Sequence, residues 1–269
     1  MATPATTGET AATASAPAAA GTARTRRPSA RRRRHHEATV EEIVKVAREL
    51  LAEEGAAGVT ISAVARRLQV VPSALYRYVA SRDELLATLT ADAFNGLAET
   101  LEVTVARLSP DDPLQGLRVA ARAWRTWALE HPTDFGLVFG APVPGFAGSE
   151  QAARAAERTG ALFTRLLTQA RAQAAAPPGP AREAGRATES TPAQRPSASA
   201  GVVPEVLHDD LVRIAGDPVT GALLVSGWVR LHGHLVAEMF GHLPPVDPAH
   251  RTELFELTIA LMLREAALT

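Results

Sequence analysis

The stretch that decides the fold lies between residues 60 and 82, and it reads TISAVARRLQVVPSALYRYVASR. Apolar residues recur at helical spacing on both sides of the segment Gln69-Val70-Val71, which predicts two short helices joined by a tight turn. The first helix is expected to start at Thr60, and Pro72 is suited to the first turn of the second, which we expect over residues 72–79. Two short helices in this arrangement form a helix-turn-helix unit.

The charge of this stretch fits a polyanionic partner. It contains no acidic residue and four basic ones, which are Arg66, Arg67, Arg77 and Arg82. A basic face confined to the helix-turn-helix is what attraction to DNA phosphates requires. Tyr76 and Tyr78 can each donate a hydroxyl hydrogen bond to phosphate, a contact that fixes register without reading bases.

Helices are also predicted on both sides of this unit. Upstream, Thr39 is followed three residues later by an acid, a capping box from which we expect a helix that ends at Gly55. Downstream, Ser81 and Glu84 form a second capping box and open a long helix expected to reach about Arg107.

The rest of the chain reads as helix as well, and no segment alternates with the two-residue period of a strand. Expected helices cover residues 113–130, 132–139, 148–173, 217–241 and 247 to the end. The fold is therefore predicted to be all-α. We expect a disordered Arg-rich tail over 1–37, a helix-turn-helix domain over 38–86, and a larger helical body over 87–269 with a disordered Pro-rich loop over 174–200.

Charge is distributed unevenly along the chain. The net charge is -1, but residues 1–38 carry seven Arg and two Glu. The run Arg31–Arg34 ends this basic tail and, taken alone, fits a solvated linker as well as a phosphate-binding arm. A basic end on an acidic body indicates a polyanionic partner at one end only.

Composition and motifs exclude several classes of protein. The 269 residues contain no cysteine, so a disulfide scaffold, a thiolate zinc site and a cysteine nucleophile are excluded. The sequence has no phosphate-binding glycine loop and no GxSxG or HExxH motif, so we expect no catalytic residues, no cofactor and no enzyme activity. His232 and His234 lie two apart on an expected helix and point to different sides, so we expect no metal site. The absence of a long apolar run or signal sequence favours a cytoplasmic protein without membrane association.

Two parts of the chain resemble a known family. The quoted stretch, continued by Ser81-Arg82-Asp83-Glu84-Leu85-Leu86, is similar to the headpiece of the TetR/AcrR transcriptional regulators over about residues 39–90. Three body segments resemble the C-terminal domain of an actinobacterial-type branch of that family: 124–132 (WRTWALEHP), 135–140 (FGLVFG) and 228–233 (WVRLHG).

Four positions depart from the usual headpiece. Gln69 stands where Gly is common in the turn, and Val71 stands where a capping Ser is common. Tyr78 replaces a common His, and Val79 replaces a common Phe. A non-Gly residue in a left-handed turn position costs about 1 kcal/mol, so these departures bear on the geometry of the turn.

The resemblance implies a set of DNA contacts. Thr60 and Ser62 would touch phosphate; Ser73, Ala74 and Arg77 would face the major groove or its edge; Tyr76, Tyr78 and Arg82 would hold the DNA backbone. Packing within the headpiece is the alternative for the two tyrosines. Beside such a headpiece, we interpret the run Arg31–Arg34 as an accessory phosphate or minor-groove contact.

The resemblance also implies an effector pocket in the body and a dimer formed by the last two helices. The sequence supports the dimer independently, because each of these helices carries two apolar stripes, more than one surface helix needs. Burial within the monomer is the alternative. Pocket candidates are aromatic and methionine side chains of the body, each of which fits the core as well: Trp124, Trp127, Phe135, Phe139, Phe146, Phe163, Trp228 and Met239.

Together these features predict a ligand-responsive homodimer that binds a double-stranded DNA operator as a repressor and is released by a small apolar or amphipathic effector. The alternatives are a ligand-independent architectural DNA-binding protein, a transcriptional activator, and a helical enzyme with an incidental helix-turn-helix. A body of this size, larger than dimerisation alone requires, favours the ligand-responsive protein.

Overall fold

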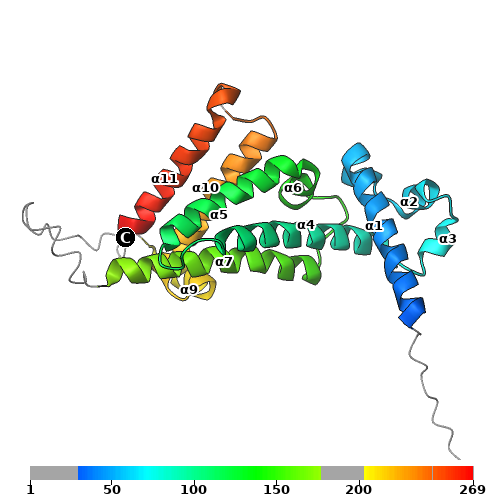
Figure 1. Ribbon diagram of the computed structural model, residues 1–269, viewed down its shortest axis with the longest axis horizontal. Helices are drawn as coiled ribbons and strands as arrows, with labels where there is room; N and C mark the ends of the chain where they lie inside the picture. The colour runs from blue at the N-terminus through cyan, green and yellow to red at the C-terminus, as the bar shows by residue number, and fades with distance from the viewer. Residues whose placement is uncertain (1–29, 177–202, 244, 269) are drawn as a thin grey trace, which may run out of the picture.

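The computed structural model describes residues 30–176, 203–243 and 245–268, and every regular element in these ranges is a helix (Figure 1). This confirms the predicted all-α fold. The α-helices are α1 Ala30–Gly58, α2 Ile61–Arg67, α3 Pro72–Leu75, α4 Arg82–Val105, α5 Pro113–Glu130, α6 Pro132–Phe139, α7 Glu150–Ala175, α9 His208–Ala215, α10 Pro218–Met239 and α11 Arg251–Leu268. Short 3₁₀ turns, Glu205–Leu207 and Pro248–His250, precede α9 and α11. Residues 1–29 of the expected tail and residues 177–200 of the expected loop lie outside the described residues.

Side-chain caps fix where several helices begin. The Thr60 hydroxyl oxygen accepts a hydrogen bond of 3.1 Å from the Ala63 N–H at the start of α2. The Ser81 hydroxyl oxygen accepts one of 3.1 Å from the Glu84 N–H at the start of α4. Asp217 accepts from two backbone N–H groups at the start of α10. Each cap stabilises its helix by about 1 kcal/mol, and the three predicted starts are confirmed.

The first helix begins at Ala30 rather than at Thr39, so residues 30–37, expected to be disordered, are helical. Thr39 lies inside the helix, where its hydroxyl donates a hydrogen bond of 2.8 Å to the His35 carbonyl. The physical reason is that no Gly or Pro interrupts the chain between Ala30 and Gly55, and Ala and Arg are strong helix formers. Gly55, with φ of 70°, interrupts the helical conformation where an end was expected.

The helix after the turn is shorter than predicted. It ends at Leu75 instead of Val79, because the N–H groups of Tyr78 and Val79 both bond to the Leu75 carbonyl, at 2.8 and 3.0 Å, and close a turn.

The buried side chains form two cores joined by one helix. Side chains from α1, α2, α3 and α4 build the core of the headpiece, in which Ile43, Val64 and Leu86 are fully buried. The second core lies in the body between α4, α5, α6, α7, α10 and α11, around Trp124 and Phe135. Since α4 contributes to both cores, it runs from the headpiece at one end of the molecule into the body at the other (Figure 1).

A partly buried ion pair ties three helices of the body together. The guanidinium of Arg125 on α5 donates hydrogen bonds of 2.8 and 2.6 Å to the carboxylate of Glu238 on α10. It also donates one of 3.3 Å to Thr252 on α11 and lies over the ring of Phe255. Within the described ranges, none of the helices combines the length and apolarity needed to cross a membrane.

Candidate nucleic-acid interface and effector cavity

The turn between α2 and α3 keeps a tight geometry despite its unusual residues. Gln69 adopts a left-handed conformation with φ of 57°, a region in which Gly is favoured. The Val70 N–H bonds to the Ala65 carbonyl at 3.0 Å and the Gln69 N–H bonds to the Arg66 carbonyl at 3.2 Å. These two bonds are the pair of a Schellman motif, which satisfies the last carbonyls of α2. Val71 precedes α3 without a side-chain cap. The unusual residues at positions 69 and 71 therefore cost some local stability but leave the turn geometry unchanged.

Several of the expected DNA contacts are exposed on α2 and on the segment after the turn. Ser62, Ser73 and Arg77 are exposed, and Ala74 is half-buried. The side chain of Tyr76 is 57% exposed, so its hydroxyl is available to a partner. Thr60 uses its hydroxyl oxygen as the cap acceptor and keeps the hydroxyl proton for donation.

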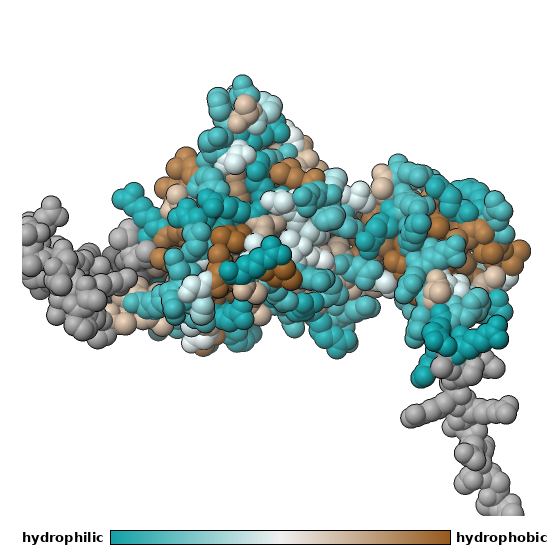
Figure 2. Space-filling view, in the orientation of Figure 1, coloured by the Kyte–Doolittle hydropathy of each residue, from teal (hydrophilic) through white to brown (hydrophobic). Residues whose placement is uncertain are grey.

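Tyr78 has a packing role, the alternative that the sequence left open. It is half-buried, and its ring stacks on His36 of α1 with a centroid distance of 5.1 Å. The guanidinium of Arg77 lies 6.0 Å from the centroid of the same ring. The stack places the basic first turns of α1 next to the segment after α3, and Figure 2 shows hydrophilic side chains gathered at this end of α1.

The four arginines of the helix-turn-helix differ in their partners. Arg82 donates hydrogen bonds of 2.9 Å to the carbonyls of both Val59 and Ala56, so it holds the C-terminal end of α1 against the start of α4. Arg67 pairs with Glu53 at 2.7 Å, and this hydrogen bond with Arg67 holds the pKa of Glu53 below its usual value. Within the described residues, Arg66 and Arg77 make no ion pair, so they carry the available positive charge.

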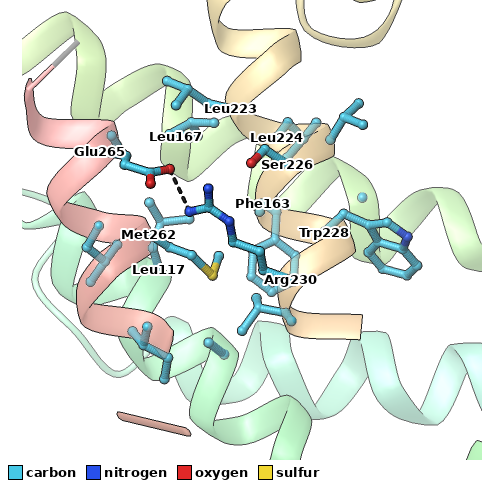
Figure 3. Close-up of a pocket in the computed structure, with 18 of the residues that line it drawn as sticks. Leu117, Phe163, Leu167, Leu223, Leu224, Ser226, Trp228, Arg230, Met262 and Glu265 are labelled. Atoms are coloured by element: carbon cyan, nitrogen blue, oxygen red, sulfur yellow. Dashed lines mark hydrogen bonds and ion pairs between the residues drawn. The ribbon is translucent and has the colours of Figure 1, made fainter. Parts of the chain in front are cut away.

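An apolar cavity of about 260 Å³ lies in the body between α5, α7, α10 and α11. Three of the candidate residues line it, namely Trp124, Phe163 and Trp228. The Trp124 indole N–H is buried and has no hydrogen-bond partner among the described residues. In Figure 3 the ion pair between Arg230 and Glu265, 2.6 Å long, spans from α10 to α11 among the apolar lining residues.

The other candidate residues lie elsewhere. Phe135 is fully buried in the body core, while Phe139 and Met239 pack against that core without lining the cavity. Phe146 packs against the headpiece core, and Trp127 lines a different cavity, described below. Sequence reasoning missed the aliphatic lining residues, among them Leu117, Leu167, Ile214, Leu223 and Met262. Leucine and isoleucine at helical spacing give the same signal whether they face a core or a cavity, so no pattern distinguishes them.

The two apolar stripes predicted on α10 and α11 have different environments. The inner stripe, which includes Leu231, Leu235, Phe255 and Ile259, is buried in the body core. The second stripe forms an exposed apolar surface that we call the outer face; it consists of Val225, Val229, Phe240, Leu257 and Leu261. Exposed apolar side chains of this number on two adjacent helices indicate a protein–protein contact.

The two histidines of α10 make separate contacts. His232 stacks on Trp228 with a centroid distance of 5.4 Å, and burial lowers its pKa. His234 shares a hydrogen bond of 3.1 Å with the Thr258 hydroxyl of α11. Across residues 30–176, 203–243 and 245–268, no three His, Asp or Glu side chains are grouped so that they could hold a metal ion.

Comparison with known proteins identifies the family of both parts. Residues 43–89 match the model of the bacterial regulatory proteins of the tetR family, and residues 117–262 match the model of the tetracyclin repressor-like C-terminal domain. The HTH-type transcriptional regulator Rv1816 of Mycobacterium tuberculosis is 42% identical over 141 residues, which are 51% of this chain and 56% of that protein. The matched region thus spans little more than half the length of this curated relative.

Solved structures share the fold. The regulatory protein SCO4313 superposes with a TM-score of 0.64 at 27% identity over 86% of this chain and 98% of that one. A protein of unknown function from Rhodococcus sp. RHA1 gives a TM-score of 0.60 at 18% identity, over 85% of this chain and 95% of that one, a likeness of fold alone. With both domain models matched in order, and the C-terminal model alone covering more than half of the chain, the protein belongs to the tetR family of bacterial regulatory proteins.

Proposed function

We propose that the protein is a ligand-responsive DNA-binding repressor that acts as a cytoplasmic homodimer. The observation that carries this proposal is the exposed helix-turn-helix, in which Arg66, Tyr76 and Arg77 are all exposed and the two arginines make no ion pair among the described residues. In a complex with DNA, α3 would enter the major groove. Ser73, Ala74 and Arg77 would face the major groove or its edge, while Thr60, Ser62, Tyr76, Tyr78 and Arg82 would be near phosphates.

The outer face of α10 and α11 supports the homodimer. A two-fold axis beside these helices would bring the outer faces of two copies together in a four-helix bundle and remove their apolar side chains from water. Such a dimer presents two headpieces to successive major grooves, about 34–36 Å apart or somewhat more, so we expect a near-palindromic operator. Sedimentation or light scattering that showed a monomer with full operator affinity would contradict this arrangement.

The apolar cavity supports control by an effector. Its walls, which include the rings of Trp124, Phe163 and Trp228, suit a small apolar or amphipathic molecule. The signal would travel along α4, because this helix belongs to the core beside the cavity and to the core of the headpiece. Coupling of about 1–3 kcal/mol is expected, and by linkage operator DNA must weaken effector binding by the same factor.

The test combines ligand screening with DNA binding. Medium-chain fatty acids and hydrophobic drugs are screened by thermal shift, and operator affinity is measured by fluorescence anisotropy with and without each stabilising compound. Phe163→Trp, which reduces the cavity, is the variant that should lose both stabilisation and release. If compounds fill the cavity and operator affinity does not change, the protein is a ligand-independent architectural one. If the compounds change operator affinity but expression of a reporter gene falls when the protein is deleted, the protein is an activator.

A further inference from the structure

A second cavity lies where the headpiece meets the body. It has a volume of about 540 Å³, is bounded by α1, α4, α5 and α6, and shares no lining residue with the apolar cavity. Its walls carry three carboxylates, those of Asp92, Glu99 and Asp134, against one guanidinium, that of Arg48. The cavity therefore has an excess of negative charge.

The Arg48 guanidinium is held loosely by the carboxylates around it. The Arg48 guanidinium lies 3.4 Å from the Asp92 carboxylate and 3.9 Å from that of Asp134, whereas a charge-assisted hydrogen bond is about 2.7–2.9 Å long. Burial raises the pKa of Asp92; Arg48 lowers it only in part, and Asp134 raises it further. A ligand cation beside Arg48 would find the carboxylates of Asp92 and Asp134, which Arg48 alone does not satisfy.

Trp127 of α5 also lines the cavity and presents a hydrogen-bond donor there. The Trp127 side chain is 3% exposed, and no described residue accepts its indole N–H. The nitrogen faces the cavity at Gly96, since a Cβ added to this glycine would lie 3.8 Å from it. Asp134 Oδ1, by contrast, is buried without a hydrogen-bond partner among the described residues, and a buried polar atom is expected to have one.

The hydroxyl groups of the α4 wall act as acceptors only. Thr100 donates its proton to the Gly96 carbonyl at 2.8 Å, and Thr104 donates its proton to the Thr100 carbonyl at 2.6 Å. Both residues line the cavity, so their oxygens can only accept hydrogen bonds from a ligand there. The wall thus combines charged and neutral acceptors with one donor, which suits a cationic ligand that carries several N–H groups and one oxygen.

We propose that this cavity binds a small organic cation, a primary ammonium or guanidinium with an oxygen acceptor a few bonds away. The cationic group would lie between Asp92 and Asp134, and the oxygen would accept the Trp127 N–H. The ligand would displace Arg48, whose guanidinium links α1 to the carboxylates of α4 and α6. Because α1 forms part of the headpiece core, the cation would change how the headpiece is held. This last consequence, and not the binding itself, rests on the proposed DNA-binding function.

The binding test uses 4-amino-1-butanol as probe and 1,4-butanediol as its neutral counterpart. The protein has three tryptophans, so their indole N–H signals in an NMR spectrum are few, and Trp127→Phe identifies the one of interest. We expect the amine to shift the Trp127 signal with saturation in the millimolar range, as suits so small a ligand, and the diol to leave it in place. Equal shifts with both compounds, or no shift with the amine at about 50 mM, would overturn the proposal.

Variants separate the site from nonspecific effects. Asp92→Asn should weaken binding of the amine by about threefold, because a partly exposed carboxylate contributes modestly. The double variant Asp92→Asn, Glu99→Gln should weaken binding further. Gly96→Leu should block the cavity, whereas Arg48→Gln should tighten binding by removing the competing cation. Glu157→Gln, an exposed change on α7, is the matched control and should have no effect. An unchanged affinity in Asp92→Asn and Gly96→Leu would place the amine elsewhere.

A DNA-binding measurement distinguishes this site from the proposed function. If the amine saturates the Trp127 signal but the protein without amine binds no operator, the regulator proposal fails and the cation site stands. If the operator is bound normally and the amine does not bind, the cation site fails alone.

Discussion

At the scale of single residues, Gln69 carries a local cost that the fold tolerates. Its φ of 57° lies in the left-handed region, where a side chain costs about 1 kcal/mol relative to Gly. We predict that Gln69→Gly raises the free energy of unfolding by about 0.5–1 kcal/mol, measured by urea denaturation at fixed protein concentration. Gln69→Ala is the control and should give no gain, because it keeps a Cβ. A loss of stability in Gln69→Gly would mean that the Gln69 side chain makes a stabilising contact.

The exposed side chains of the helix-turn-helix should divide into two classes. Tyr76→Phe removes a hydroxyl that we assign to a phosphate contact, so it should weaken binding to operator DNA and to scrambled DNA alike. Changes at Ser73 or Arg77 should alter operator preference, by about 1–3 kcal/mol for a residue that reads a base. Binding curves on both DNAs decide the assignment. A loss confined to the operator in Tyr76→Phe would contradict the phosphate role.

Arg82 illustrates how a residue expected to contact DNA can be committed to the protein. Its two hydrogen bonds, to the Ala56 carbonyl in the last turn of α1 and to the Val59 carbonyl just after it, hold the end of α1 against the start of α4. The phosphate contact stays a prediction, and any loss of DNA binding in Arg82→Ala must be compared with its stability. The Arg82→Lys variant keeps the positive charge but cannot donate to both carbonyls in the same geometry. It therefore separates a phosphate contact from the structural role of Arg82.

At the scale of elements, the basic start of α1 is a helical extension that contacts the segment after α3 through the stack of His36 on Tyr78. Deleting residues 1–34 removes seven Arg and one Glu. We predict lower DNA affinity and a slope of log K against log salt that is smaller by about two to three, as expected if two or three Arg reach phosphates. Changing Arg31, Arg33 and Arg34 to Gln keeps the chain length and should reproduce part of the effect. An unchanged slope would mean that the extension is only solvated.

At the scale of the whole molecule, the pair between Arg125 and Glu238 holds the body together. The two side chains are 15% and 4% exposed, so removal of one partner leaves a charge in a poorly solvated place. We predict that Glu238→Ala lowers the free energy of unfolding by about 3–5 kcal/mol. The double variant Arg125→Met, Glu238→Leu should recover most of this loss, because apolar side chains of similar size replace the pair. A single variant that lost less than about 1 kcal/mol would show that the pair is effectively solvated.

The sequence alone determined the features whose cause is local. Caps at Ser81 and Asp217 follow from a polar side chain placed next to a helical pattern, and the structure has both of them. The helix start predicted at Thr60 is also present, and Thr60 caps it. A glycine at a C-terminal cap position predicted the end of the helix before α2 at Gly55. The structure interrupts the helix there, with a φ of 70°, but α1 continues to Gly58. The start of α1 was predicted wrongly, because the capping signal at Thr39 competed with the helix propensity of residues 30–38, and propensity prevailed.

Only the tertiary structure decided which residues share a site. Periodicity showed that α10 and α11 each have two apolar stripes, but not which one is buried, because both stripes satisfy the same pattern. Likewise Trp124 and Trp127 are one turn apart on α5, yet they line different cavities. The partners that separate them lie on α4, α7 and α10, far along the chain. Such long-range packing leaves no signal in a single sequence, whereas caps, turns and helical periods are written within a few residues.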